Sequence, residues 1–163
     1  MYGWGKRLDR AAHVVDHGGN PVDANVWNNA IKAMPNRFKK NRKGLKFFAG
    51  SNVVQDYLFA IRDLPTNTVQ GQEGMRPFGL DVVEVDLFNQ EKAGDYSGAT
   101  GVHSDVWLTD PQNLVLGVRR NIQVYKQFAQ KKDSVEYTMY VRMGTAVDNP
   151  SAAVVVKNIK ISG

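Results

Sequence analysis

Three histidines and a neighbouring aspartate are the side chains best suited to metal or acid–base chemistry. His13, Asp16 and His17 place two imidazoles four residues apart, a spacing that would bring both to one face of a helix. The segment lacks a helical apolar pattern and an HExxH glutamate, and His103 lies far away in a glycine-rich stretch. The chain has no cysteine, so thiolate chemistry is excluded. We expect a solvated polar segment, with no catalytic residue, no metal and no cofactor.

A run of cations is the densest charge cluster of the chain. Six of the 21 basic residues lie between residues 37 and 46 with no acid among them: Arg37, Lys39, Lys40, Arg42, Lys43 and Lys46. Such a cluster is able to contact phosphates. It also follows a predicted helix, whose last carbonyls favour nearby cations, and no exposed aromatic array for base stacking is interleaved with it. Helix capping is the stronger interpretation, and phosphate contact stays open.

Nucleophilic catalysis has little support in the sequence. Ser51 stands between a predicted strand and a predicted helix, as AGSNV, but the second glycine of the GxSxG elbow is missing and a helix N-cap explains the serine. The glycines of residues 94–101 match neither phosphate-loop pattern. The sequence therefore predicts no enzyme.

Composition indicates an ordinary globular chain. Its 163 residues suffice for one domain or two small lobes, and 42% are hydrophobic and 23% charged. The net charge is +5, and without the six clustered cations 15 basic residues face 16 acidic ones. The longest apolar runs fall far short of the ~20 residues that span a bilayer, and the first residues do not have the pattern of a secretory signal. We expect no membrane partner.

The first two thirds of the chain mix helices and strands. Residues 1–19 show little periodicity and predict a lead-in loop. Asn20-Pro21 predicts a helix start with Asn20 as N-cap, and the helix should end at Pro35. Its apolar stripe comprises Val22, Val26, Trp27, Ala30, Ile31 and Met34.

A strand–helix unit follows this first helix. Residues 44–50 predict a buried strand, and a helix should begin directly after it and end near Asp63. Another strand is predicted over residues 78–86. Long loops are predicted over residues 63–77 and 89–104.

The remainder is predicted to be antiparallel β structure, with strands over residues 105–110, 113–118, 121–128, 134–144 and 152–161. In SVEYTMYVRMG, apolar residues alternate with more polar ones, which predicts one buried face and one face that meets water or a partner. Residues 121–128 and 134–144 should form a hairpin arm that extends roughly 30 Å.

The order of these segments resembles the tailed-phage major capsid proteins of the Hong Kong ninety-seven type. MPNRFKKNRKGLKFFAGSNVVQDYLFAIRD is similar to the helix, basic turn, strand and helix of the family's A-domain, and FGLDVVEVD to a later A-domain strand. DVWLTDPQNLVLGVRRNIQVYKQF and SVEYTMYVRMGTAVDNPSAAVVVKNI are similar to the family's closing β segments. Together these stretches cover about 140 positions in the expected order.

The resemblance implies an α+β phage capsid fold. It would comprise a lead-in loop over residues 1–19, an A-domain-like lobe with a mixed sheet and flanking helices over 20–110, and antiparallel P-domain-like strands over 111–163. Residues 1–20 are too few to supply the family's N-arm, E-loop and spine helix. The subunit-interface candidates are Arg119, Arg120, Arg142 and Glu136, since arginine forms oriented, bidentate pairs with carboxylates.

The implied function is a structural subunit of an icosahedral phage shell that encloses double-stranded DNA without sequence-specific contact. Its partners would be further copies in pentamers and hexamers, together with portal, scaffold or decoration proteins. It would lie in the phage head, and in the host cytoplasm during assembly. The alternatives are a small α+β nucleic-acid-binding protein that uses the basic turn at residues 37–46, or a truncated capsid homologue that interferes with assembly.

Overall fold

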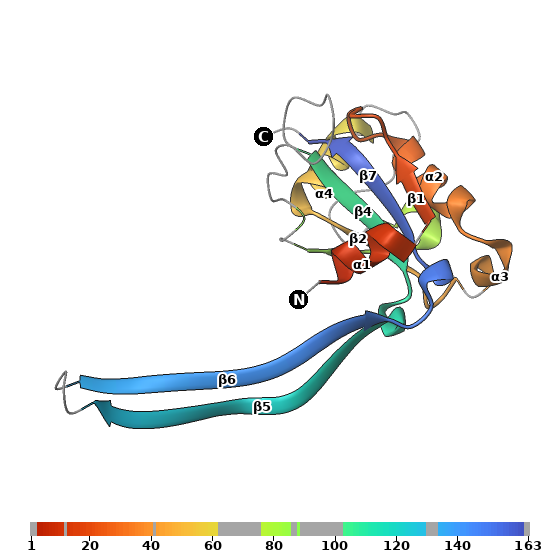
Figure 1. The fold of residues 1–163 in the computed structure, drawn as a ribbon. Coiled ribbons are helices and arrows are strands. Elements are labelled where there is room, and N and C mark those ends of the chain that lie inside the picture. Colours follow the sequence, from red (N-terminus) through yellow and green to blue (C-terminus); the bar gives the residue numbers. More distant parts are fainter. Residues whose placement is uncertain are drawn as a thin grey trace.

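The computed structural model shows a helix-bearing lobe from which a long two-stranded ribbon projects (Figure 1). It describes residues 3–11, 13–40, 42–61, 76–85, 88, 103–129 and 134–161. The expected α+β class is confirmed. None of the helices in this described part is long and apolar enough to cross a membrane.

The lobe is built on a mixed sheet whose strand order, among the described residues, is β1-β7-β4-β2-β3. The strands are β1 (His13–Asp16), β2 (Lys46–Ala49), β3 (Asp81–Glu84), β4 (His103–Thr109) and β7 (Val154–Lys160). β1 runs parallel to β7 and β3 parallel to β2, whereas β4 is antiparallel to both β2 and β7. The last strand of the chain, β7, therefore lies between the first strand, β1, and the central strand, β4.

Helices cover the two faces of this sheet unequally. On one face, α2 (Ala24–Ala33) and α4 (Ser51–Ile61) bury the larger core against alternate strand residues. Trp27 stands at its centre, with its ring edge-on to Phe47 at 4.9 Å and to Tyr57 at 5.4 Å. The other face carries α1 (Trp4–Ala11), whose Leu8 is fully buried in a smaller cluster with Ala153 and Val155.

The predicted stripe of α2 is confirmed, but the helix starts three residues later than expected. Asp23 is the N-cap, and its carboxylate accepts hydrogen bonds from the backbone N–H groups of Asn25 and Val26. Pro21 instead forms a bridge to Lys160 beside β7. Asp23 and Asn20 are both good helix N-caps, so the sequence alone did not decide between them. Beyond Pro35 the chain adds a short helix, α3 (Asn36–Lys39), where only a turn was expected.

The expected lead-in loop is wrong for most of the described residues before Gly18. This segment forms α1 and then β1, which pairs with β7. Both elements are short: α1 is an amphipathic helix of eight residues that buries only Leu8 fully, and β1 has four residues and is mostly exposed. The chain then turns through Gly18 and Gly19, which have φ values of +70° and +71°, a conformation suited to glycine.

The strand–helix unit of residues 44–61 is confirmed as β2 and α4, with the helix beginning at Ser51 itself. β3 starts at Asp81, later than predicted, because residues 77–79 form a 3₁₀ turn in which Phe78 has φ +54°. The predicted loops at 63–77 and 89–104 lie mainly outside the described residues. Their ends, residues 76–77 and 103–104, are described, and the latter belong to β4.

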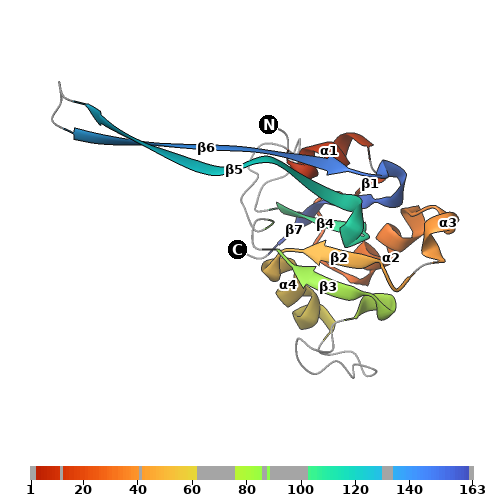
Figure 2. The ribbon, with the colours of Figure 1, turned by 90° about the horizontal axis from the view of Figure 1, so that it is seen from below.

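The predicted hairpin arm is confirmed as the ribbon of β5 (Leu114–Ala129) and β6 (Ser134–Val147). The two strands expected between residues 113 and 128 are one continuous strand, and register shifts between Val118 and Gln123 stand where a break was predicted. After β6 the chain returns to the lobe, where β7 joins the lobe sheet. The residues after 110 are therefore divided between the ribbon and the lobe sheet. Viewed from below, the ribbon extends away from the lobe with no other described element over it (Figure 2).

Candidate subunit interface

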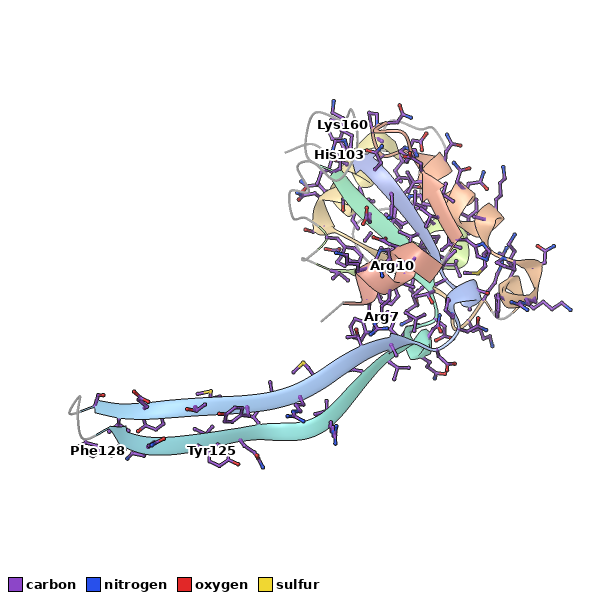
Figure 3. All side chains as sticks on the ribbon, in the orientation of Figure 1. Arg7, Arg10, His103, Tyr125, Phe128 and Lys160 are labelled. Carbon is purple, nitrogen blue, oxygen red and sulfur yellow. The ribbon has the colours of Figure 1, made fainter. Side chains whose placement is uncertain are left out.

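The exposed apolar surface of the described residues is concentrated on the ribbon. Of 16 exposed large hydrophobic residues, 13 lie on β5 and β6: Val115, Leu116, Val118, Ile122, Val124, Tyr125, Phe128, Val135, Tyr137, Met139, Tyr140, Val141 and Met143. Figure 3 shows side chains, among them those of Tyr125 and Phe128, standing off the ribbon with no second layer of described protein against them. Contiguous exposed apolar surface of this kind marks an interaction site.

One face of the ribbon is mainly apolar, with Lys126 among its apolar side chains, opposite Tyr137. The register sets Phe128 opposite Val135 and Val124 opposite Met139, and opposed residues share a face. Met139 is 70% exposed and Val135 is 42% exposed. The sequence predicted that this face is buried. In a single copy this face is exposed, and no element among the described residues covers it beyond the base of the ribbon.

The opposite face is more polar and carries tyrosines. Tyr125 and Tyr140 meet edge-on at 5.8 Å, and the Tyr125 hydroxyl donates to Gln123 Oε1 at 3.1 Å. A hollow of about 520 Å³ lies here, lined in part by Tyr125, Tyr140 and Arg142. Tyrosine and arginine are enriched in the centres of protein interfaces, so this face is also suited to contact a partner.

The four predicted interface residues fall into two places on the ribbon. Arg119, Arg120 and Arg142 meet at the register shift, where Arg120 and Arg142 are opposed, whereas Glu136 lies farther out, opposite Gln127. The side chain of Arg120 lies outside the described residues. Within the described part, Arg119 and Arg142 form no ion pair, and they line a hollow of about 470 Å³.

The base of the ribbon is fixed to the lobe by residues that the sequence did not single out. The Trp4 indole N–H is shared between the carbonyls of Val115 and Ala146, both at 3.2 Å, so that α1 contacts both strands. Asn113, at the start of β5, is buried and bonded to the chain that leaves β6. A lone tryptophan and a lone asparagine give no periodic signal, and only the fold reveals their partners.

The predicted phosphate-contact residues differ in their contacts and exposure. Lys39 donates to the carbonyl of Lys32 at 3.3 Å, which is the helix-capping role that the sequence favoured. The Arg37 guanidinium lies 4.5 Å from the centre of the Phe38 ring, and Lys46 is half-buried on β2. Lys40, Arg42 and Lys43 are exposed. Phosphate contact by these residues stays a prediction.

The histidines do not gather into a site. His13 lies on β1 rather than on a helix, His17 Nε2 is 3.0 Å from the Pro21 carbonyl, and His103 is buried at the start of β4. The described residues contain no group of three side chains that would hold a metal. Asp16 accepts from the backbone N–H of Gly18 at 2.8 Å and from Asn158 Nδ2 at 3.2 Å. These bonds lower the pKa of Asp16, the Gly18 bond most, and mark it as structural.

A curated protein is similar to this chain in sequence. "Putative prophage capsid protein YqbE" of Bacillus subtilis (strain 168) is 26% identical over 124 residues, which are 74% of this chain and 39% of that protein. No family model matches the chain.

Solved shell proteins share the fold. The encapsulin SrpI complex of Synechococcus elongatus PCC 7942 matches 93% of this chain with a TM-score of 0.63 and 15% identity. The capsid of a native GTA particle matches 91% of this chain with a TM-score of 0.62 and 15% identity. The procapsid of satellite phage P4 matches 85% of this chain with a TM-score of 0.57 and 17% identity. The chain spans about two fifths of the curated protein and 38% to 54% of these three structures. The predicted capsid fold is confirmed.

Proposed function

We propose that this chain, which has the fold of tailed-phage major capsid proteins and resembles a prophage capsid protein in sequence, is a structural subunit of a phage shell. The observation that carries the proposal is the uncovered ribbon. A two-stranded hairpin is at best marginally stable alone in water, and this one exposes large apolar side chains along most of its length. Neighbouring copies in a shell would provide the missing cover.

Charge distribution supports docking of the ribbon on the lobe of another copy. Residues 114–147 contain six basic and two acidic side chains, a net of +4, and residues 37–46 contribute +6. Subtracting both from the total of +5 leaves −5 on the rest of the chain. The basic ribbon is complementary to the acidic part of the lobe, which is the part outside the basic turn, and this complementarity favours association and orients it.

The proposal includes the wider setting of such a subunit. Copies gather as pentamers and hexamers around double-stranded DNA that they enclose without reading its sequence, and portal, scaffold or decoration proteins contact the shell. The subunit acts in the phage head, is assembled in the host cytoplasm, and carries no catalytic activity. Encapsulins share the fold, and the sequence similarity to a prophage capsid protein favours the phage shell.

Sedimentation and negative-stain microscopy of the purified chain test this function. We expect rings, sheets or closed shells in a concentration-dependent manner. Replacing Ile122 and Met139 by Glu places two charges on the apolar face, at side chains that are each 70% exposed, and should abolish the particles while the lobe stays folded.

Val14→Glu provides the matched control, because Val14 is also an exposed apolar strand residue but lies on β1. It should assemble like the parent chain. A parent chain that sediments as a monomer at every concentration contradicts the proposal, and so does equal loss of particles in the control and in the ribbon variant.

A further inference from the structure

The ribbon joins the lobe through two short turns of the same design. Before β5, Pro111–Asn113 form a 3₁₀ turn capped by Asp110, whose carboxylate accepts from the Gln112 N–H at 2.9 Å. After β6, Pro150–Ala152 form another, capped by Asn149, whose side chain accepts from the Ser151 N–H at 3.1 Å. Proline fixes φ and Asx side chains bond their own turn, so both passages are rigid.

Asn113 bonds the two turns to each other and to the lobe sheet. Its Oδ1 accepts from the Asn149 N–H at 2.6 Å, and its Nδ2 donates to the Asn149 carbonyl at 3.0 Å. One side chain thereby meets both backbone groups of one residue, as a neighbouring strand would. Nδ2 also donates to Thr109 Oγ1 at 3.1 Å, at the end of β4.

Two further bonds complete this arrangement, which we call the Asn113 clamp and which comprises Thr109, Asn113, Asn149 and the two 3₁₀ turns. The carbonyl of Asn113 accepts from the Asp148 N–H at 3.0 Å, and the Thr109 hydroxyl donates to the Ala152 carbonyl at 3.3 Å. Asn113 is 7% exposed and Thr109 is fully buried, so water replaces these bonds poorly.

The clamp lies at the base of the ribbon, so a small change of angle there moves the tip by a large distance. β6 has 14 residues and β5 has 16, which correspond to roughly 45–50 Å at ~3.3 Å per residue. A tilt of about 5° at the base therefore moves the tip by about 4 Å, by the same dimensions. Contacts between subunits are sensitive to shifts of this size, since packed interfaces match the density of protein interiors.

We propose that Asn113 is a positioning residue that fixes the direction in which the ribbon leaves the lobe, and through it the angle between neighbouring subunits. The second half rests on the proposed shell function. The first half concerns a single copy and stands or falls without the shell. At the same base, Trp4 of α1 shares one N–H between the carbonyls of β5 and β6, whereas Asn113 forms three side-chain hydrogen bonds.

Paired spin labels measure the direction of the ribbon. The chain has no cysteine, so Gln55→Cys on α4 and Thr138→Cys on β6 place one label on the lobe and one on the ribbon, both at exposed positions. Labelled chain is diluted into excess unlabelled chain, so that only distances within one copy are recorded. We expect a narrow distance distribution in the parent, at least twice as broad after Asn113→Ala, and unchanged after Gln112→Ala, because only the backbone of Gln112 takes part in the turn and its exposed side chain contributes no bond to the clamp.

Circular dichroism and thermal melting establish that the lobe of each variant is folded. If Asn113→Ala does not fold, Thr109→Val carries the same test, since it keeps the shape of the side chain and removes one acceptor of the clamp. A distribution as narrow as that of the parent in the folded variant overturns the assignment and leaves Trp4 as the residue that sets the direction.

Microscopy of the same proteins tests the consequence for assembly. We expect Asn113→Ala particles to have a broader range of diameters or curvatures than the parent and the Gln112→Ala control. Particles of unaltered diameter, together with a broadened label distribution, overturn the link to subunit angle. A parent chain that forms no particles overturns the shell function instead, while the label measurement still decides whether Asn113 positions the ribbon.

Discussion

At the scale of single residues, one exposed carboxylate holds the turn between β1 and α2. Asp16 accepts hydrogen bonds from Gly18 and from Asn158, a residue of β7 with the unusual φ of +60°. Its ionised form is therefore favoured in the folded chain, and its pKa is lowered, mainly by the Gly18 bond. A group with a lowered folded-state pKa stabilises the protein above its unfolded pKa, and this contribution is lost as the pH falls through the folded value.

Asp16→Asn should consequently weaken the dependence of the free energy of unfolding on pH in the acidic range. Between pH 7 and pH 3 the parent loses the contribution of the carboxylate, and the variant has none to lose. The effect should be below about 1 kcal/mol, because the group is exposed to solvent. Melting temperatures across this pH range measure it, with Asp148→Asn as control, an exposed carboxylate at the ribbon base. Parallel pH profiles for the parent and Asp16→Asn would show that these two bonds do not stabilise the fold.

Residues that work in repeated patterns were predictable, and residues that work singly were not. The α2 stripe repeats at helical spacing, and its members Val26, Trp27 and Ala30 are fully buried as expected. Trp4 bonds Val115 and Asn113 bonds Asn149, in each case across more than 30 residues of sequence. A sequence contains no local mark of such a pair, because any exposed turn accepts an asparagine.

At the scale of elements, the ribbon beyond its base differs from the strands of the lobe sheet in having no layer of described protein over either face. Hydrogen bonds in strands without a packed face open easily, because little apolar burial is lost on opening. β4 and β7 are the opposite case, since both are interior strands of the lobe sheet and largely buried. The two sheets of one molecule should therefore differ in stability.

Hydrogen exchange followed by mass spectrometry should show this difference directly. In dilute, unassembled protein we expect amides of β5 and β6 beyond the base to exchange at least about 100-fold faster than those of β4 and β7. After assembly, the ribbon amides should become protected while those of β4 change little. Ribbon amides as protected as β4 amides in the lone chain would show that the ribbon needs no neighbour, and the proposed function would lose its main support.

The long strands were easier to predict than the short ones. Alternation over SVEYTMYVRMG identified β6, although the prediction that its apolar face is buried fails for one copy. The pattern records burial in the environment where the chain works, and a single subunit provides only part of that environment. α1 is amphipathic but was missed because it is only eight residues long, and β1 was missed because four residues are too few to build a periodic signal.

At the scale of the whole molecule, the last strand returns to the lobe and ties the ribbon to its centre. β7 lies between β1 and β4, and the preceding turn belongs to the Asn113 clamp. The predicted boundary at residue 110 follows the order of segments along the chain, whereas the sheets follow hydrogen bonding. Long-range pairing of this kind is not encoded in local periodicity, which is why the strands of the C-terminal third were predicted and their division between two sheets was not.

DNA binding by the basic turn, residues 37–46, would distinguish a nucleic-acid-binding protein from a shell subunit. If Lys39, Lys40 and Lys43 contacted phosphates, replacing all three by Ala would lower the slope of log affinity for duplex DNA against log salt by about 2.7, at ~0.9 per contact. We expect a change in slope below about 1, because Lys39 already donates a hydrogen bond to a helix carbonyl.

A net charge of +5 attracts DNA without any dedicated site, so the parent slope alone is not informative. The matched variant replaces Lys6, Lys32 and Lys160, three exposed lysines of the lobe outside the turn, and removes the same charge. Under the shell proposal the two triple variants bind DNA with similar slopes. A slope that falls by about 2.7 only in the basic-turn variant would assign the turn to DNA, since equal net charge leaves location as the difference between the proteins.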